Sequence, residues 1–264
     1  MSQTQQPLSV YVDGQGEQTI LMIHGWPDTY RVWDEQVAAL SPHYRCVRVT
    51  LPNFNQQGAR HAYRFGDVVA MINQVVDEVS PNKPVILLIH DWGCVFGYQF
   101  YRQYPHKVSH LISIDIGDAL SKDYLKSLKA YQALMIVSYQ LNLAAAWFLP
   151  EAIGTPLTKL VAKALQQPTP AEPVHRGMNY PYFQTWFKPI SDPVKPFSIV
   201  PDCPMLYVYA KHKPVMFQSK QWLARVAAQQ SNQVVAMEAG HWLMREQAPT
   251  FNSLVLNWLQ SSQC

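Results

Sequence analysis

Short apolar segments rich in β-branched residues recur along the chain and alternate with longer segments whose apolar residues fall at helical spacing. Nearly continuous apolar runs are typical of strands buried on both faces of a parallel sheet, and they lie at residues 18–24, 44–50, 83–90, 108–115, 203–210 and 232–239. Apolar residues three and four positions apart predict covering helices, at residues 33–40, 65–80, 97–105, 219–230 and 249–260. The alternation predicts an α/β fold with a mostly parallel, doubly wound sheet.

Residues 119–198 interrupt this alternation. They hold two segments with a helical pattern, a short proline cluster and the aromatic stretch MNYPYFQTW. An insertion of this kind between two strands of a sheet is expected to form a helical lid over the strand ends. We therefore predict a core from residues 1–118 and 199–264 and a cap from residues 119–198.

Charge and cysteine usage narrow the classes of partner. The 21 Lys and Arg against 18 Asp and Glu are scattered, so no basic patch predicts nucleic-acid binding. The four cysteines lie far apart without a C-x-x-C pair, unlike a zinc site or a disulfide-rich scaffold. No signal peptide is visible, and the apolar runs are shorter than the roughly 20 residues that cross a bilayer. We expect a cytoplasmic protein without a cofactor, a metal or a membrane partner.

The sequence His90-Asp91-Trp92-Gly93 directly follows the strand predicted at residues 83–90 and precedes a helical segment. A sharp strand-to-helix turn exposes its central residue at the carboxyl end of the strand, where open α/β sheets bind ligands. Asp91 is that residue and is our candidate nucleophile. The alternative is that Asp91 only caps the helix that follows, a position that aspartate favours.

Two further motifs stand in matching places along the chain. H-G-W-P at residues 24–27 follows the first apolar strand, and His241 lies between the last strand and the final helix. In this order the motifs resemble the α/β-hydrolase fold family, and specifically its branch with an aspartate nucleophile, the epoxide hydrolases and haloalkane dehalogenases. The resemblance implies the α/β-hydrolase fold, His241 as the base, and an oxyanion hole formed by the backbone N–H groups of Trp26 and Trp92. His24 is expected to hold its loop by hydrogen bonds rather than to catalyse.

An aspartate nucleophile supports a different chemistry from a serine. Its ordinary pKa of about 3.9 leaves Asp91 ionised at neutral pH without a neighbouring base. A carboxylate displaces a leaving group from a saturated carbon and leaves an alkyl-enzyme ester. His241 would then draw a proton from the water that attacks this ester, while the oxyanion hole holds the developing charge. If His241 only starts a helix, no such hydrolysis is expected.

The acid that orients the histidine is missing from its usual position. After the strand predicted at residues 203–210, where the resemblance implies Asp or Glu, the chain has the basic residues Lys211, His212 and Lys213. Some haloalkane dehalogenases take this acid from the end of the strand that follows the nucleophile helix. Asp115 occupies the matching position here, so we predict Asp115 as the acid, with Asp118 as the alternative.

Two features separate the epoxide and halide branches of the resemblance. Trp26 stands where dehalogenases carry an asparagine, which favours an epoxide. An epoxide oxygen needs an acid as it leaves, and the resemblance implies cap tyrosines in that role, with Tyr180 or Tyr182 and, earlier in the cap, Tyr139 as candidates. Indole N–H groups can face a substrate or a halide, so the predicted substrate-binding residues are Trp26, Trp92 and Trp242.

We predict a hydrolase that opens a small apolar epoxide to a diol, with the organic substrate and water as its partners. The runner-up is haloalkane dehalogenation by the same Asp91, with the indoles of Trp26 and Trp92 binding the halide. A third hypothesis, motivated by the missing acid, is a catalytically weak hydrolase fold that is retained for binding. The sequence leaves open the identity and stereochemistry of the substrate and the oligomeric state, a homo-oligomer included.

Overall fold

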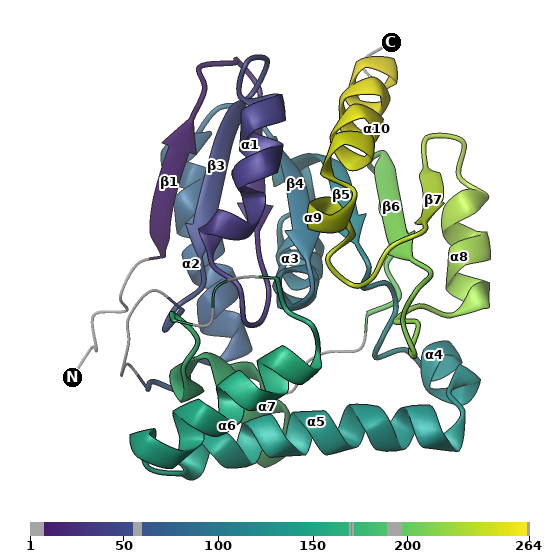
Figure 1. Cartoon of the computed structure of the whole chain (residues 1–264). Helices are drawn as coiled ribbons and strands as arrows, with labels where there is room; N and C mark the ends of the chain where they lie inside the picture. Colours follow the sequence, from purple (N-terminus) through teal and green to yellow (C-terminus); the bar gives the residue numbers. More distant parts are fainter. Residues whose placement is uncertain (1–7, 55–59, 169, 171, 189–196, 263–264) are drawn as a thin grey trace.

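The computed structural model describes residues 8–54, 60–168, 170, 172–188 and 197–262. One seven-stranded sheet runs through the molecule in the order β1-β3-β2-β4-β5-β6-β7 (Figure 1). β1 pairs antiparallel with β3, and the other neighbouring strands pair in parallel. The strands are β1 (Ser9–Asp13), β2 (Thr19–Ile23), β3 (Arg45–Thr50), β4 (Val85–His90), β5 (Val108–Ile114), β6 (Met205–Ala210) and β7 (Gln233–Met237).

The apolar runs of the sequence form the central strands, and the predicted fold class is confirmed. Every residue of β2 and of β4 is buried, as expected for parallel strands with helices on both faces. β1 was not predicted. It lies at the edge of the sheet and its residues alternate between half-buried and exposed, so it lacks the continuous apolar run that marks the inner strands.

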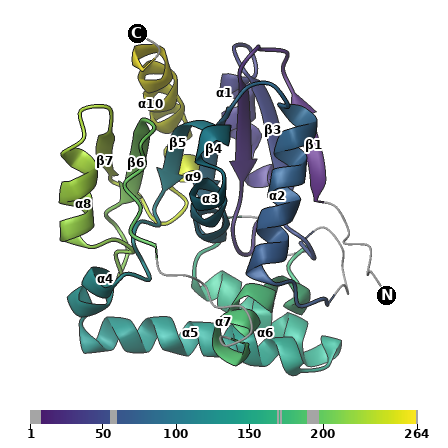
Figure 2. The ribbon, with the colours of Figure 1, turned by 180° about the vertical axis from the view of Figure 1, so that it is seen from behind.

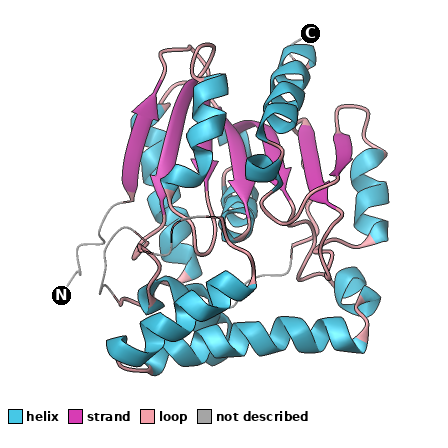
Figure 3. Ribbon diagram, viewed as in Figure 1, coloured by secondary structure: helices cyan, strands magenta, loops and turns pink. Residues whose placement is uncertain are grey.

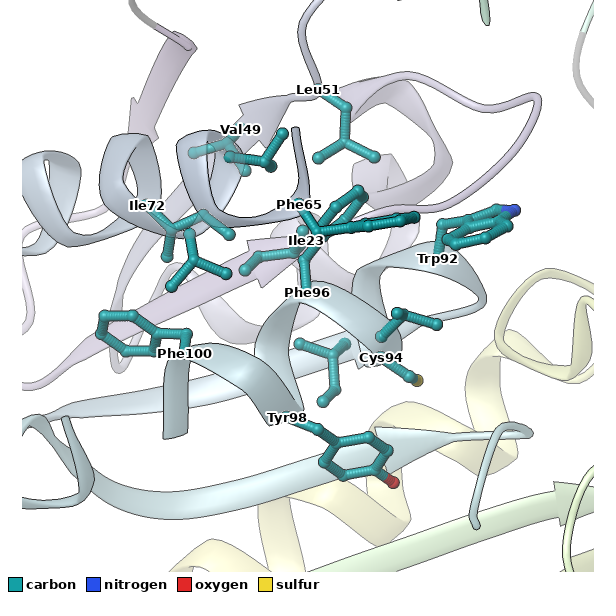
Figure 4. Packing of buried hydrophobic residues seen from close by; sticks show 14 of the residues in the cluster. Ile23, Val49, Leu51, Phe65, Ile72, Trp92, Cys94, Phe96, Tyr98 and Phe100 are labelled. Carbon is teal, nitrogen blue, oxygen red and sulfur yellow. The ribbon is translucent and has the colours of Figure 1, made fainter. Parts of the chain in front are cut away.

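Helices form an outer layer on each face of the sheet (Figures 2 and 3). Two clusters of buried apolar side chains fill the spaces between sheet and helices. In the first, Phe65 and Ile72 of one helix pack with Phe96 and Phe100 of the next and with strand residues such as Ile23 (Figure 4). The helices on that face are α2 (Phe65–Val79), α3 (Trp92–Gln103) and α8 (Lys220–Ala227), and those on the other are α1 (Asp34–Leu40), α9 (Leu243–Glu246) and α10 (Ala248–Ser261).

A group of helices between β5 and β6 lies across the carboxyl ends of the strands, at the bottom of Figure 1. These are α4 (Lys122–Ser127), α5 (Ala130–Phe148), α6 (Glu151–Ala164) and α7 (Tyr180–Phe187). Residues 169, 171 and 189–196 of the predicted cap lie outside the described residues. The exact limits of the cap therefore stay a prediction.

Buried polar contacts hold the cap to the core. The Asn53 side chain donates to the carbonyl oxygen of Gly177 at 3.1 Å, and the backbone carbonyl oxygen of Asn53 accepts from Nε2 of His175 at 2.9 Å. Gln184 of α7 donates to the carbonyl oxygen of Tyr63 at 2.9 Å. Since these bonds are shielded from water, they fix the cap over the sheet edge where functional residues are expected.

Within the ranges that the structure describes, no helix is long and apolar enough to cross a bilayer. The same ranges contain no cluster of three or more His, Cys, Asp or Glu side chains arranged to bind a metal ion.

Candidate active site

Asp91 forms the whole turn between β4, which ends at His90, and α3, which begins at Trp92. Its backbone has φ 51° and ψ −122°, in the positive-φ region that residues with a side chain rarely adopt. Gly93 permits the sharp turn, because a Cβ atom there would lie 2.1 Å from the carbonyl oxygen of Ile23. The turn therefore has the strained geometry of a nucleophile elbow.

Two backbone N–H groups meet the carboxylate of Asp91. The Trp26 N–H donates to Oδ1 at 2.6 Å, and the Trp92 N–H also donates to the carboxylate. Gly25 allows this approach, since a Cβ atom on it would lie 2.2 Å from Oδ1 of Asp91. The structure thus brings the two predicted oxyanion-hole donors onto the candidate nucleophile itself.

His24 holds the loop that carries Trp26. Its Nε2 accepts from the backbone N–H of Leu51 at 3.0 Å, so the proton resides on Nδ1, which donates to the carbonyl oxygen of Gly25 at 2.8 Å. Burial lowers the pKa of His24 to about 4, which keeps the ring neutral. The expectation that His24 stabilises the loop agrees with these bonds.

His241 connects the two carboxylates of the site. Its Nε2 lies 3.5 Å from Oδ2 of Asp91, and its Nδ1 donates to Oδ2 of Asp115 at 2.5 Å. Burial lowers the pKa of His241, but the hydrogen bonds to Asp115 and Asp91 outweigh it and raise the pKa to about 9. At neutral pH the resting site therefore holds an imidazolium between two carboxylates.

Both carboxylates stay ionised despite their burial. Burial raises the pKa of Asp91, but the hydrogen bond and charge of His241 bring it below its usual value. Burial also raises the pKa of Asp115, and the charge of Lys213 together with the bond from His241 again bring it down. Asp91 is therefore available as an anionic nucleophile.

Asp118, the alternative acid, does not reach the histidine. Its oxygens accept from the backbone N–H and hydroxyl of Ser219 at 2.6 and 2.7 Å and from the hydroxyl of Ser121 at 2.6 Å. Ser219 is also the N-cap of α8, so Asp118 ties the start of this helix to the segment after β5. Of the two predicted acids, the structure brings only Asp115 to His241.

Tyr139 and Tyr182 of the cap lie close to Asp91. The ring of Tyr182 packs edge-on against Trp26 and Trp92, with ring centroids 5.7 and 5.2 Å apart, and lies 6.1 Å from the ring of Tyr139. Burial, and then the negative charge of Asp91, raise the pKa of both phenols. Both hydroxyl groups therefore keep their protons at neutral pH and interact with the charge of Asp91.

Tyr180 is not brought to Asp91. Its ring packs edge-on against Phe54 and Tyr63, at 6.1 and 5.7 Å between centroids. Among the described residues its buried hydroxyl has no hydrogen-bond partner. Tyr180 and Tyr182 stand two positions apart on α7, where helical side chains point to different sides, so only one of the pair can face the site.

The indole N–H groups of the three predicted substrate-binding tryptophans are used within the protein. Trp26 Nε1 donates to the side-chain oxygen of Asn179 at 2.9 Å, and Trp242 Nε1 donates to Asp28 at 2.8 Å. The indole of Trp92 donates to the hydroxyl of Tyr182. Their rings can still line a pocket, but these N–H donors are already occupied.

Comparison with protein families agrees with this geometry. Residues 18–248 match the family described as alpha/beta hydrolase fold. The chain belongs to that family. An epoxide hydrolase from Bacillus megaterium, solved in complex with an inhibitor, has the same fold, with a TM-score of 0.73 and 20% identity over 96% of each chain.

Curated relatives of this alpha/beta hydrolase match over different shares of the chain. "Probable oxidoreductase EphD" of Mycobacterium tuberculosis is 29% identical over 122 residues, which are 45% of this chain and 20% of that protein. Human epoxide hydrolase 4 is 22% identical over 268 residues, 93% of this chain and 73% of that protein. A haloalkane dehalogenase of Mesorhizobium japonicum is 28% identical over 100 residues, 37% of this chain and 32% of that protein. The match to the mycobacterial protein thus spans only about a fifth of its length.

The sequence did not point to two further residues of this hydrolase site. His90 donates from Nε2 to the carbonyl oxygen of His241 at 3.0 Å, and burial lowers its pKa to about 3. Lys213 places Nζ 2.5 Å from Oδ1 of Asp115. The signals available were the position of His90 directly before Asp91 and the run of basic residues after β6, but neither indicates which partner each residue contacts.

Proposed function

We propose that this protein is an epoxide hydrolase that opens a small apolar epoxide to a diol through an ester on Asp91. The observation that carries the proposal is the set of groups around this one carboxylate: the Trp26 N–H, the ring of His241 and the cap phenols of Tyr139 and Tyr182. A carboxylate alone would also displace a halide. Proton donors beside it suit a leaving group that is an oxygen.

In the first step Asp91 attacks a ring carbon of the epoxide and the carbon–oxygen bond breaks. The freed oxygen takes a proton from Tyr139 or Tyr182, whose raised pKa keeps the phenol intact until a stronger base, an alkoxide, is formed. The ester removes the charge of Asp91, one of the two carboxylates that hold a proton on His241. The proton held on His241 then passes to the phenolate. This transfer restores the phenol and leaves His241 neutral.

In the second step neutral His241 takes a proton from a water molecule that attacks the carbonyl carbon of the Asp91 ester. The negative charge that develops on Oδ1 of Asp91 is stabilised by the N–H groups of Trp26 and Trp92, which already contact this carboxylate in the resting site. Asp115 stabilises the imidazolium. The intermediate then collapses: the bond between the Asp91 carbonyl carbon and the substrate oxygen breaks, and the imidazolium of His241 gives its proton to the departing alkoxide, which leaves as the diol. The carboxylic acid of Asp91 passes its proton to His241, and the resting site is restored.

The occupied indoles support an epoxide over a halide. A departing halide needs N–H donors, but Trp26 donates to Asn179 and Trp92 to Tyr182. Freeing either indole would leave a buried acceptor without its partner, which costs about 1–3 kcal/mol. An epoxide oxygen needs no free indole, since the phenols supply its proton.

The test is intact-protein mass spectrometry of His241→Gln after incubation with a panel of terminal epoxides and haloalkanes. Without the base the ester should accumulate, and the mass should rise by that of the whole epoxide, with the added group mapped to Asp91. The variant Asp91→Asn/His241→Gln is the matched control and should gain no mass. An adduct that forms only from haloalkanes, with the halogen lost, would identify a dehalogenase. No adduct from either class on a folded protein would contradict covalent catalysis.

A further inference from the structure

Three consecutive basic residues follow β6, and they turn in different directions. Lys211 and His212 both pair with Glu238 on the surface, where all three side chains are largely exposed. Lys213 turns inward, and its side chain is 6% exposed. A lysine is seldom buried without a specific partner, so its surroundings need an explanation.

The partner of Lys213 is Asp115, whose side chain is fully buried. Oδ1 of this carboxylate accepts from the Lys213 ammonium at 2.5 Å and from the Ala210 N–H at 2.9 Å. Oδ2 accepts from Nδ1 of His241 at 2.5 Å. One buried negative charge is therefore shared between an ammonium and the imidazole of the base, and the ring of Phe217 lies 5.0 Å from the ammonium.

Because Asp115 is shared with Lys213, the net charge around His241 changes during the proposed reaction. With both carboxylates ionised and His241 protonated, Lys213 makes the resting cluster neutral. Once Asp91 becomes an ester, Asp115 and Lys213 balance each other, so no net negative charge remains to hold the proton on His241. Without the lysine, the unbalanced charge of Asp115 would favour the imidazolium, which cannot accept a proton from water.

The other groups that face His241 do not replace this effect. His90 approaches from the end of β4 with ring centroids 4.5 Å apart, and its fully buried ring stays neutral at neutral pH. Trp242 and Phe217 contact the histidine ring but carry no charge. Cys94 is another titratable group near Lys213. Burial raises the pKa of its thiol, so the thiol stays protonated and carries no charge.

We propose that Lys213 is a positioning residue that sets the proton affinity of His241 through the shared carboxylate of Asp115. The ring is thereby free to lose its proton once Asp91 is esterified. This inference rests on the proposed roles of Asp91 and His241. It assigns a function to Lys213, a basic residue that stands after β6, where an acid was expected.

The test is an NMR titration that measures the pKa of the His241 ring and does not depend on turnover. Lys213→Met should raise the pKa of His241 in the free protein by about 1 or more, the size expected when an opposing charge is removed within a few ångströms. Lys211→Met is the matched control, because it removes an exposed lysine from the same loop, and it should leave the pKa unchanged. Equal values for wild type and Lys213→Met would overturn the proposal.

Two further variants separate charge from packing. Lys213→Gln can keep a hydrogen bond to Asp115 without the charge and should raise the pKa of His241 as Lys213→Met does. Lys213→Arg keeps the charge and should leave the pKa near the wild-type value. If Lys213→Met does not fold, the comparison of Gln with Arg decides, and equal values for these two would overturn the proposal.

If the wild-type protein turns over an epoxide, the pH dependence of kcat provides a second test. The acid limb of the kcat profile should move to higher pH in Lys213→Met and Lys213→Gln, and it should stay in place in Lys211→Met. An acid limb that does not move would contradict the role in ester hydrolysis. If wild type turns over no epoxide, the proposed function fails while the NMR titration still tests the coupling of Lys213 to His241.

Discussion

The hydroxyl groups of three cap tyrosines have different surroundings, and this difference can be tested. Tyr139 and Tyr182 sense the charge of Asp91, whereas Tyr180 packs against Phe54 and Tyr63. Tyr139→Phe and Tyr182→Phe should each lower kcat for an epoxide by about 10²-fold or more, because each removes a positioned proton donor. Steady-state kinetics on the purified variants would measure this.

Tyr180→Phe is the matched control for the two phenol variants. Its hydroxyl is buried and has no hydrogen-bond partner among the described residues, so its removal should leave kcat unchanged and should not lower stability. If Tyr180→Phe loses as much activity as Tyr182→Phe, the assignment of the acid to Tyr182 is wrong. If neither Tyr139→Phe nor Tyr182→Phe is affected, the cap phenols are not the acid.

Among individual residues, the sequence predicted those that a local motif identifies. Asp91 follows a buried strand directly and Gly93 is required by the turn, so both can be recognised from a few neighbouring letters. The ion pair of Lys213 and Asp115 joins residues 98 positions apart, and no local pattern encodes it. The choice between Tyr180 and Tyr182 depended on where α7 begins, a boundary that the sequence does not fix to one residue.

Among the elements, the loop after β2 and the start of α3 must approach closely. A Cβ atom on Gly25 would lie 2.2 Å from Oδ1 of Asp91 and 2.5 Å from the backbone nitrogen of Trp92. Gly25→Ala should therefore push the carboxylate away from its N–H donors and lower kcat by about 10²- to 10³-fold. Kinetics together with circular dichroism would separate this loss from unfolding.

Gly66 in α2 provides the control for this substitution. A Cβ atom there would meet nothing within 4 Å, so Gly66→Ala should leave kcat unchanged. Alanine is the better helix former, and the free energy of unfolding should rise by up to about 1 kcal/mol. A Gly25→Ala variant as active as Gly66→Ala would show that the loop tolerates a side chain and that the N–H contacts matter less than we infer.

The elements that the sequence predicted well are those with a continuous apolar pattern. β4 and β5 are almost wholly buried, and their runs of apolar residues could form little else between turns. β1 has the sequence SVYVD, which is too short and too polar to be separated from a loop without its antiparallel partner β3. Pairing with a distant strand, rather than local preference, makes this segment a strand.

Across the whole molecule, three histidines with opposite pKa shifts predict how stability depends on pH. The pKa of His241 is raised to about 9 in the folded protein, while burial lowers those of His24 and His90 to about 4 and about 3. A histidine in the unfolded chain titrates near about 6.5. His241 therefore stabilises the fold below that pH, and His24 and His90 stabilise it above that pH, relative to their other protonation states.

The sign of each effect follows from which state binds the proton more tightly. As pH rises from about 6.5 to about 9, the folded protein loses the contribution of His241, on the order of 3 kcal/mol for a pKa difference of this size. As pH falls below about 6.5, the unfolded chain gains protons that buried His24 and His90 refuse, so stability falls again. We expect the free energy of unfolding to be largest near neutral pH.

Urea denaturation of wild type and His241→Gln at pH 5, 7.5 and 9 would isolate the contribution of His241 to the free energy of unfolding. The glutamine variant cannot carry the proton, so the difference in unfolding free energy between the two proteins should shrink as pH rises, while the loss on the acid side, which comes from His24 and His90, should persist in both. A difference that stays constant over this range would mean that Asp91 and Asp115 do not hold a proton on His241. The charge arrangement of the resting site would then have to be revised, together with the order of proton transfers that we derive from it.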